Sequence, residues 1–401
     1  MYKVADPGIK YTVAAEVGEN VHGLQVVGEY TVLRKVGEGA FGKVYDVKCT
    51  STGEHFAMKE YSKASLRRRR QTDGMRSARG RGIMMPRGRG AGRGGLFAAR
   101  RVAMQRQQEE EASDPFSLIK AELAVSKKLL HPNVVRLYEV MNDDEQDILY
   151  LVIDLCQRGP VQKLDTVTWR SEPLDADAAH QYFVQALLGL EYLHGNDIIH
   201  RDLKPDNLLL TSDNVLKIAD FGESTVVLGD DDKITGFTGT PAFTAPELCQ
   251  GTHEVSGEAT DIWSLGVCLY SFIYGMLPFE GSSVFEVLDA ISQDDLSFPG
   301  PCDEQLRDLI GRMLDRSPDT RIAIPEIRQH PWVTRNGQFH LPTKEDNCAN
   351  VVGPITQDDM DNTIKHIYDI MPVILAIAKL RRFRRHIKRD NKSNTAEPNQ
   401  D

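Results

Sequence analysis

One segment constrains this chain more than any other: it reads His200-Arg201-Asp202-Leu203-Lys204-Pro205-Asp206-Asn207. It places a carboxylate, a lysine and an amide within a few residues of one another. We expect Asp202 to take the proton from a substrate hydroxyl, Lys204 to neutralise charge on a transferring phosphoryl group, and Asn207 to ligate one Mg²⁺. Because a chance match of this length on a surface loop is rare, the segment predicts a catalytic loop for phosphoryl transfer.

A second acidic motif follows this loop. Asp220-Phe221-Gly222 comes directly after a strand-like run from Val215 to Ala219. An aspartate at the end of a short strand can hold a divalent cation against phosphate oxygens. We therefore expect Asp220 to be a second protein ligand for Mg²⁺.

Ala245-Pro246-Glu247 closes the segment that begins with this acidic motif. Within it, Thr235 and Thr238 are candidate activating phosphorylation sites, although each also fits a plain loop threonine. Arg201 could receive the added phosphate and so order the segment. Gly239-Thr240-Pro241 is expected to form the shelf for the substrate residue that follows the acceptor.

The N-terminal half carries a glycine-rich turn, Gly37-Glu38-Gly39-Ala40-Phe41-Gly42-Lys43-Val44, between two strand-like runs. Because Gly37, Gly39 and Gly42 have no side chains, backbone N–H groups could approach the phosphates of ATP closely. Val44 would pack on the base. Taken alone, the same glycines fit an ordinary hairpin equally well, so the ATP interpretation depends on the other motifs.

Phe56-Ala57-Met58-Lys59 places a lysine at the end of a strand, where it could hold the α- and β-phosphates. A lone strand-end lysine is more often a solvated charge, so Lys59 requires a helix carboxylate to fix its ammonium. Glu122 is the best candidate, on a helix that reaches Leu130, although it also fits an exposed helix glutamate. Glu109 to Glu111 compete with it, but they adjoin a stretch that we expect to be disordered.

Two patterns of apolar residues divide the chain. From Tyr30 to Ala57, short apolar runs alternate with glycine turns, which indicates strands and hairpins. From Leu174 onward the runs are longer and amphipathic. Residues 178–194 carry apolar side chains at helical spacing, namely Phe183, Leu187, Leu190 and Leu193. The pattern predicts an α+β fold with a small β-rich lobe before a larger, mostly helical lobe.

A stretch at about 64–113 fits neither lobe. It is dominated by Arg and Gly, with Arg67-Arg68-Arg69-Arg70 and Arg87-Gly88-Arg89-Gly90. Ordering glycine costs the most entropy and arginine resists burial, so we expect this insert to be disordered. The formal net charge of −10 hides the insert and a second basic stretch near the end, and therefore says little about partners.

The six cysteines are widely scattered, and no pair has the close spacing of a zinc knuckle or a redox motif. The first residues lack the apolar core of a signal peptide. The longest apolar run, Ile370 to Ala378, is far short of the ~20 residues of a membrane span. We expect reduced thiols, no transmembrane segment, and a cytoplasmic protein that could also be nuclear.

With these motifs, the chain resembles the eukaryotic protein kinase family from about Tyr30 to Val333. The resemblance implies the bilobal protein kinase fold, with a leader at 1–29, an N-lobe at 30–156, a C-lobe at 157–333 and a regulatory tail at 334–401. It also implies ATP and Mg²⁺ as cofactors. Lys204 and Thr240 imply Ser or Thr as the acceptor on a protein substrate. Every catalytic part is present, so we expect an active enzyme.

Three further assignments rest on this resemblance. Asp154 and Cys156 lie in the implied hinge that pairs with adenine, so both are expected to bind ATP. Asp261 resembles the helix aspartate that braces the catalytic loop. Glu247 and Arg321 resemble the buried ion pair of the family.

A narrower resemblance is to the calcium/calmodulin-dependent protein kinase kinases. Gln157-Arg158-Gly159-Pro160-Val161 follows the hinge as it does in that group, and Gly239-Thr240-Pro241-Ala242-Phe243 precedes the Ala-Pro-Glu motif. The end of the domain, at His330-Pro331-Trp332-Val333-Thr334, and the long basic insert are also similar. The insert departs from the group in being rich in Arg and Gly, with Pro86 as its one proline. The resemblance implies that the substrates are activation-segment threonines of other kinases, such as calmodulin-dependent kinases or AMP-activated kinase.

The tail contains a basic amphipathic stretch. Asn362-Thr363-Ile364-Lys365-His366-Ile367 resembles the start of the group's autoinhibitory segment. Beyond it, apolar residues lie on steps of four, three and six and are flanked by Lys and Arg: Ile370, Ile374, Ile377 and Phe383. A helix of this kind, within about 357–389, is what an acidic calmodulin groove binds. A helix docked on the kinase, or lying on an anionic membrane, is the alternative.

Two other functions stay open. One is a constitutive kinase of the fungal Snf1-activating type, whose tail is only a docking element. The other adds RNA binding through the Arg/Gly-rich insert, for which a solvated spacer is the plainer interpretation.

Overall fold

The computed structural model describes residues 8–12, 15–39, 42–66, 119–143, 145–227, 232–236, 238–249, 254–300 and 303–349. They fall into two compact units. The strand unit contains the described residues of Ile9–Ser117 and Tyr138–Val152, and the helical unit those of Leu118–Leu137 and Ile153–Gln357. The insert after Leu66 and the tail after Ala349 lie outside the described residues. The predictions of disorder, autoinhibition, calmodulin binding and RNA binding made for them lie outside too.

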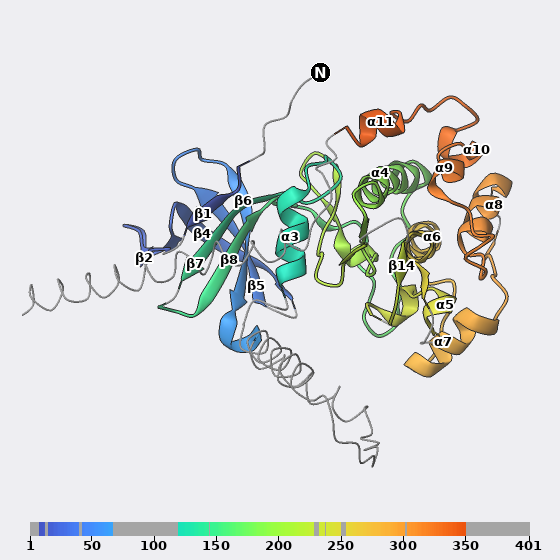
Figure 1. Cartoon of the computed structure of the whole chain (residues 1–401), viewed down its shortest axis with the longest axis horizontal. Coiled ribbons are helices and arrows are strands. Elements are labelled where there is room, and N and C mark those ends of the chain that lie inside the picture. The colour runs from blue at the N-terminus through green and yellow to red at the C-terminus, as the bar shows by residue number, and fades with distance from the viewer. Residues whose placement is uncertain are drawn as a thin grey trace, which may run out of the picture. The chain divides into compact units, whose positions relative to one another are not determined.

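The strand unit is built on one eight-stranded sheet (Figure 1). Its strands are Lys10–Thr12 (β1), Val17–Glu19 (β2), Gln25–Val27 (β3), Tyr30–Gly39 (β4), Gly42–Cys49 (β5), His55–Ser62 (β6), Leu137–Asp143 (β7) and Ile148–Ile153 (β8). Their order across the sheet is β1-β7-β8-β6-β5-β4-β3-β2. β1 runs parallel to β7, and β2 to β6 pair as successive antiparallel neighbours.

Three strands of this sheet precede Tyr30, where the family resemblance placed the start of the kinase domain. Tyr30 donates a hydrogen bond to Glu139 of β7 at 2.9 Å, and Thr12 of β1 donates to the same carboxylate. Lys10 forms an ion pair with it at 3.5 Å. Glu139 is 1% exposed, so these partners satisfy a buried charge. The N-terminal residues are therefore part of the sheet.

The helical unit consists mainly of helices. They are Lys120–Lys128 (α3), Ala176–His194 (α4), Pro246–Cys249 (α5), Gly257–Tyr274 (α6), Val284–Gln293 (α7), Glu304–Met313 (α8), Ile324–Ile327 (α9), Pro331–Thr334 (α10) and Lys344–Asn347 (α11). Its short strands are Gly159–Pro160 (β9), Ile198–Ile199 (β10), Leu208–Leu210 (β11), Leu216–Ile218 (β12), Thr225–Val226 (β13), Lys233–Ile234 (β14) and Val255–Ser256 (β15). Two 3₁₀ turns complete it, Pro205–Asn207 (η1) and Pro241–Phe243 (η2). The division into a β-rich and a mostly helical unit confirms the predicted α+β class.

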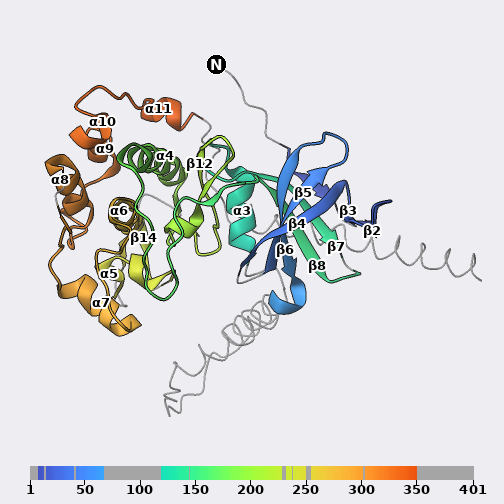
Figure 2. The same cartoon turned by 180° about the vertical axis from the view of Figure 1, so that it is seen from behind.

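Two long helices form the centre of this unit, and Figures 1 and 2 both show α6 between α4 on one side and α5 and α7 on the other. α4 confirms the helix predicted from apolar spacing, because Phe183, Leu187 and Leu190 are fully buried. It begins at Ala176, where Asp175 caps it by accepting a hydrogen bond from the N–H of Ala178. No helix in the described ranges is long and apolar enough to cross a membrane.

α6 is buried along most of its length and is mostly apolar, as expected of a helix inside a core. Ser256 caps its start, and the helix ends at Gly275, whose φ is +65°. A Cβ at Gly275 would lie 2.3 Å from the carbonyl oxygen of Ser171, so a larger residue would displace that loop. Asp261 and Trp263 of α6 are completely buried. Asp261 of this helix is hydrogen-bonded to the backbone of the catalytic loop.

Candidate active site

The catalytic loop connects β10 to β11, and its backbone is hydrogen-bonded to the carboxylate of Asp261. One carboxylate oxygen of Asp261 accepts hydrogen bonds from the N–H of His200 at 2.8 Å and from the ring of His194 at 2.9 Å. The other oxygen accepts from the N–H of Arg201 at 2.9 Å. Arg201 has φ +67°, an uncommon conformation for a non-glycine residue, and these bonds fix it. Asp261 therefore braces the loop, as the kinase resemblance implied.

The structure brings Asp202, Lys204 and Asn207 together. Lys204 Nζ donates to Asp202 Oδ2 at 2.7 Å, and the amide nitrogen of Asn207 donates to the same oxygen at 3.2 Å and to the Asp202 carbonyl at 2.8 Å. With its nitrogen committed to Asp202, Asn207 offers its amide oxygen as the ligand atom for a cation. The carboxylate is thus oriented by two donors, and a third residue, Thr240, reaches its other oxygen.

Thr240 completes the cluster from the far end of the segment after Asp220. Its N–H and its hydroxyl both donate to Asp202 Oδ1 at 3.0 Å, and its hydroxyl accepts from Lys204 Nζ at 2.8 Å. The preceding Gly239 has φ +83°, and a Cβ there would lie 2.6 Å from the carbonyl of Arg201 and 3.0 Å from Asp202 Oδ1. Only glycine lets this shelf approach the catalytic loop so closely.

His200 connects the catalytic loop to the Asp220 motif. Its Nε2 donates to the carbonyl of Ala219 at 3.1 Å, and its Nδ1 accepts from the N–H of Asp202 at 3.3 Å. Its ring also contacts Phe221 edge-on, with 5.6 Å between ring centres. Asp220 has φ +65°. The position of Asp220 relative to Asp202 is therefore set through one fully buried imidazole.

The guanidinium of Arg201 is bound by the segment that contains the candidate phosphorylation sites. It donates to the hydroxyl of Thr225 at 2.8 Å and to the carbonyls of Thr235 at 3.0 Å and Gly236 at 2.9 Å. Burial lowers its pKa from the usual 12.5. Arg201 thus binds this segment through a hydroxyl and two carbonyls, without a phosphate group on either threonine. Whether Thr235 or Thr238 is phosphorylated stays a prediction.

The implied hinge residues directly follow β8, at the start of the Ile153–Gln357 stretch of the helical unit. The N–H of Asp154 donates a hydrogen bond to the carbonyl of Arg136 at 3.1 Å. The Asp154 carboxylate accepts from the N–H of Arg136 and from Lys217 Nζ, both at 2.9 Å. A contact of Asp154 with adenine would therefore use its carbonyl oxygen. Burial raises the pKa of the Cys156 thiol to about 12, so this cysteine stays protonated at neutral pH.

In the strand unit, the residues expected to bind ATP are aligned across three strands. Gly37 of β4 lies opposite Val44 of β5, and Val44 lies opposite Lys59 of β6. Directly opposed residues of neighbouring strands share one face of a sheet, so the glycine turn and the lysine share a face. Lys59 Nζ also lies 5.1 Å from the ring centre of Tyr61.

The turn itself is tight. Gly39 pairs with Gly42, and the two residues between them, 40 and 41, lie outside the described part of the chain. A Cβ at Gly42 would lie 1.5 Å from the carbonyl oxygen of Glu60. Packing against β6 therefore requires glycine at position 42, independently of any role of this residue in phosphate binding.

Glu122 and Lys59 belong to different units. Glu122 lies on α3 of the helical unit and is 7% exposed, so the interpretation as an exposed helix glutamate is wrong. The pairing of Lys59 with Glu122 would join the two units and stays a prediction. Glu109 to Glu111 lie outside the described residues.

The buried ion pair implied by the resemblance is present. Arg321 donates to both carboxylate oxygens of Glu247, at 2.7 and 2.9 Å, and to the carbonyls of Ala259 at 2.7 Å and Asp315 at 2.9 Å. Its side chain is fully buried. Arg321 thus connects Glu247, at the end of the segment that begins at Asp220, to Ala259 of α6.

Two contributors to the site were missed from the sequence. His194 ends α4 and donates to Asp261, and Lys217 of β12 holds the Asp154 carboxylate. His194 lies in the apolar run of a core helix, and Lys217 reads as a solvated strand lysine. For His194, the sequence shows only a polar residue within an apolar helix. This suggests that its ring has a hydrogen-bond partner but does not identify that partner.

The comparisons with known proteins agree with this geometry. Residues 86–333 match the protein kinase domain family, and the chain belongs to that family. Together with its Ser/Thr kinase relatives, the membership makes the protein a serine/threonine kinase with the predicted bilobal fold. The matched range begins after the glycine turn and Lys59, which the insert separates from the rest.

Its relatives include calcium/calmodulin-dependent protein kinase kinases, which confirms the narrower resemblance. The enzyme cmkC of Emericella nidulans is 35% identical over 375 residues, which are 88% of this chain and 67% of the relative. That of Caenorhabditis elegans is 39% identical over 298 residues, 72% of this chain and 54% of the relative. The serine/threonine-protein kinase STK11 of Gallus gallus is 34% identical over 310 residues, 77% of this chain and 60% of the relative. The chain thus spans about half to two thirds of these proteins.

Proposed function

We propose that this kinase transfers the γ-phosphoryl group of ATP to a Ser or Thr hydroxyl of other protein kinases. The observation that carries the proposal is the single hydrogen-bonded cluster of Asp202, Lys204, Asn207 and Thr240. In the reaction the acceptor oxygen bonds to the γ-phosphorus, the bond to the β–γ bridging oxygen breaks, and ADP leaves. Asp202 accepts the hydroxyl proton. Lys204 lies within hydrogen-bonding distance of that carboxylate and neutralises charge on the transferring group.

The remaining roles follow from position. Gly37, Val44 and Lys59 share one face of the sheet, so the glycine turn and the ammonium can address the triphosphate together, with Gly39 and Gly42 closing the turn. Glu122 would orient Lys59. At the hinge, the Asp154 carbonyl and the Cys156 N–H would pair with adenine.

Asn207 and Asp220 fit the requirements for Mg²⁺. Both offer oxygen ligands, which this hard cation prefers, and the amide oxygen of Asn207 is set by the bonds of its nitrogen to Asp202. Bound Mg²⁺ would shield negative charge on the phosphates. His200 connects the two ligand residues, because it bonds to Ala219, which precedes Asp220, and to Asp202, which accepts hydrogen bonds from Asn207.

The substrate class is inferred from the relatives, two of which are named as kinase kinases. We infer that this enzyme likewise phosphorylates activation-segment threonines of calmodulin-dependent kinases or AMP-activated kinase. By the same inference, the tail stretch at about 357–389 inhibits the kinase until calmodulin binds it. A tenfold activation needs only about 1.4 kcal/mol of differential binding, so a modest contact of the tail is sufficient.

A transfer assay tests both inferences. The full chain, a chain ending at Ala349 and an Asp202→Asn control are incubated with a catalytically inactive AMP-activated kinase domain, with Ca²⁺/calmodulin or with chelator. The cut at Ala349 keeps α11, whose Asn347 donates to Glu191 of α4 at 2.9 Å. We expect the full chain to respond to Ca²⁺/calmodulin, and the shortened chain to be active in both conditions.

Equal transfer by the full chain in both conditions would reject calmodulin control and favour the constitutive Snf1-activating type. Lack of transfer to this substrate, with activity on other proteins, would reject the substrate class.

A further inference from the structure

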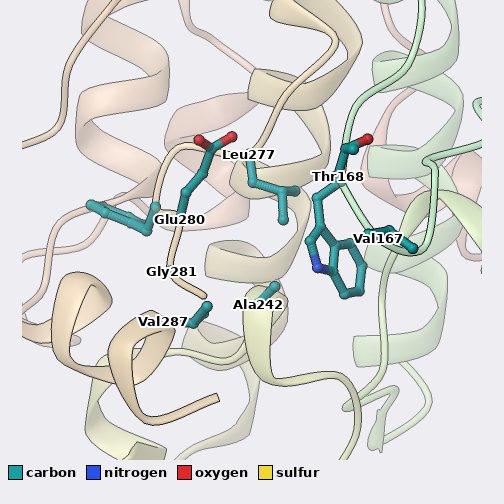
Figure 3. A pocket seen from close by; sticks show the side chains of 9 residues that line it. Val167, Thr168, Ala242, Leu277, Glu280, Gly281 and Val287 are labelled. Atoms are coloured by element: carbon teal, nitrogen blue, oxygen red, sulfur yellow. The ribbon is translucent and has the colours of Figure 1, made fainter. Parts of the chain in front are cut away.

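Two features of the helical unit lie outside the catalytic cluster. One is a mostly apolar pocket of about 350 Å³, lined on one side by the Trp169 loop (residues 165–170) and on the other by Val287 of α7 (Figure 3). The other is the short helix α11, which lies beyond residue 333, where the match to the kinase family ends. Hydrogen bonds lead from α11 to the residues expected to bind Mg²⁺, so α11 is the feature that bears on catalysis.

α11 is attached to the helical unit through one polar side chain. Among the residues of this helix, Asn347 alone is partly buried, and the others are exposed. Its amide nitrogen donates to the carbonyl of Leu188 at 3.0 Å and to the carboxylate of Glu191 at 2.9 Å, both on α4. Its amide oxygen accepts from Nε2 of His131 at 3.0 Å. Both polar groups of the Asn347 side chain are therefore used to attach α11.

The partners of Asn347 fix the orientation of its amide. Glu191 is 3% exposed, and its carboxylate also pairs with Arg328 at 2.6 Å. A carboxylate paired with a guanidinium is ionised and only accepts hydrogen bonds, so the NH₂ group of Asn347 must face it. The amide oxygen then faces His131. The bond between Asn347 and His131 thus has one possible direction, with the imidazole as donor.

His131 lies in the connection between α3 and β7. Its Nδ1 accepts from the N–H of Asn133 at 3.0 Å, which leaves the ring proton on Nε2 for Asn347. The ring stacks on Tyr192 of α4, with 4.8 Å between ring centres. The hydroxyl of Tyr192 accepts from the N–H of Leu130 at 3.0 Å. This part of the connection is therefore held by both α4 and α11.

Asn133 joins the same connection to β12, the strand that leads to Asp220. Its carbonyl accepts from the N–H of Ile218 at 2.8 Å, and its side-chain amide donates to a second carbonyl of β12 at 2.9 Å. The next residue, Ala219, donates its N–H to the carbonyl of Asn207 at 2.9 Å. Both expected Mg²⁺ ligands, Asn207 and Asp220, are thus connected to the end of β12.

We propose that Asn347 is a positioning residue for the metal ligands Asn207 and Asp220, and that it acts through His131 and β12. The inference rests on the proposed function, because that function assigns Mg²⁺ to these two residues. A contiguous series of bonds does not by itself establish energetic coupling, so the experiment must measure coupling directly.

Calorimetry of Mg²⁺ binding to the full chain saturated with ADP provides the test. In Asn347→Ala, the Kd for Mg²⁺ should rise about fivefold or more, while the Kd for ADP without Mg²⁺ should not change. Hydrogen exchange at the amide of Ile218 should be faster than in the wild type. Glu345→Ala is the matched control, because Glu345 is exposed on the same helix, and its removal should change none of the three quantities.

A double-mutant cycle shows whether Asn347 acts through His131. The double variant with His131→Ala should bind Mg²⁺ no more weakly than His131→Ala alone, because the contact is already lost. Chains ending at Ala349 and at Pro342 give a second comparison, since both lack the tail and only the first keeps α11. The shorter chain should bind Mg²⁺ about fivefold more weakly.

An unchanged Mg²⁺ affinity in Asn347→Ala, or additive losses in the double variant, would overturn the inference. Asp220→Ala separates this result from a failure of the proposed function. If Asp220→Ala binds Mg²⁺ as tightly as the wild type, the assignment of the metal ligands is wrong, and the inference is rejected with it. Weak binding by Asp220→Ala together with normal binding by Asn347→Ala would reject the inference alone.

Discussion

Thr240 and Asp202 are joined by two hydrogen bonds of 3.0 Å, both to the same carboxylate oxygen, although Asp220 and most of the segment that follows it lie between them in the chain. The expected catalytic base is therefore oriented from two sides, by Lys204 and Asn207 within its own loop and by Thr240 from the shelf. The conformation of the shelf and the orientation of the base are therefore linked by these hydrogen bonds. This coupling gives the segment a direct means of controlling catalysis.

Substitutions of Thr240 distinguish the contribution of its hydroxyl from that of its backbone N–H. Thr240→Val loses the hydroxyl bonds to Asp202 and Lys204 but keeps the N–H bond, and we expect kcat to fall about tenfold to a hundredfold. Thr240→Ser retains the hydroxyl and should stay within a few-fold of the wild type. Steady-state kinetics at saturating ATP measure both variants. Equal activity of the valine and serine variants would contradict the role of the hydroxyl.

Gly239→Ala tests the close approach of the shelf. The new Cβ would meet the Arg201 carbonyl and the Asp202 carboxylate, so we expect a strong loss of kcat. Gly236→Ala is the matched control, because φ is +80° at Gly236 and +83° at Gly239, but a Cβ at Gly236 meets nothing within 4 Å. Both variants carry the cost of a positive φ, about 1 kcal/mol. Similar kcat values for the two would show that strain alone accounts for the effect.

The Arg321–Glu247 pair should dominate the stability of the shelf. Arg321→Met leaves the Glu247 carboxylate and two backbone carbonyls without their donor, and we expect it to lower the free energy of unfolding by about 3–5 kcal/mol. Arg312→Met removes an ion pair with Glu326 whose side chains are 42% and 55% exposed, and should cost at most about 1 kcal/mol. Urea unfolding of both variants measures the difference, and comparable losses would contradict it.

His131 predicts a dependence of stability on pH. Its Nε2 donates to Asn347 at 3.0 Å and its Nδ1 accepts from the N–H of Asn133 at 3.0 Å, so the folded protein requires the neutral ring. Burial lowers its pKa below the usual 6.5, and Lys217 adds to this effect. The unfolded chain therefore binds a proton first as the pH falls. The contribution of His131 to stability is complete above pH 6.5 and decreases as the pH falls towards the lower pKa of the folded state.

Unfolding of the wild type and of His131→Gln at pH 7.5 and 5.5 tests this sign. The wild type should lose more stability than the variant between the two pH values. Identical losses would show that His131 does not titrate differently on unfolding.

The catalytic loop and the long helix α4 could be predicted because their signals are local: a contiguous motif, and the 3.6-residue spacing of Phe183, Leu187 and Leu190. The strands before Tyr30 could not. β1 has three residues and is a strand only because it pairs with β7, more than a hundred residues away. The Lys217–Asp154 ion pair depends on tertiary contacts in the same way.

The Trp169 loop shows a different limit. An aspartate followed by Thr, Val and Thr suggests a turn, but no pattern indicates that the tryptophan has a positive φ. The conformation is held by the hydrogen bonds of this loop to Asp165. A residue in a strained conformation marks a place where local preference and tertiary structure disagree, and sequence reasoning fails there for that reason.

The most direct test of the central claim is phosphoryl transfer by the full-length protein and by Asp202→Asn. Each is incubated with γ-labelled ATP and Mg²⁺ and the inactive AMP-activated kinase domain, and the labelled amino acid is identified. The account predicts label on threonine or serine, with a kcat for Asp202→Asn that is lower by about 10²–10⁴. Label on tyrosine, or undiminished transfer by a well-folded Asp202→Asn protein, would contradict it.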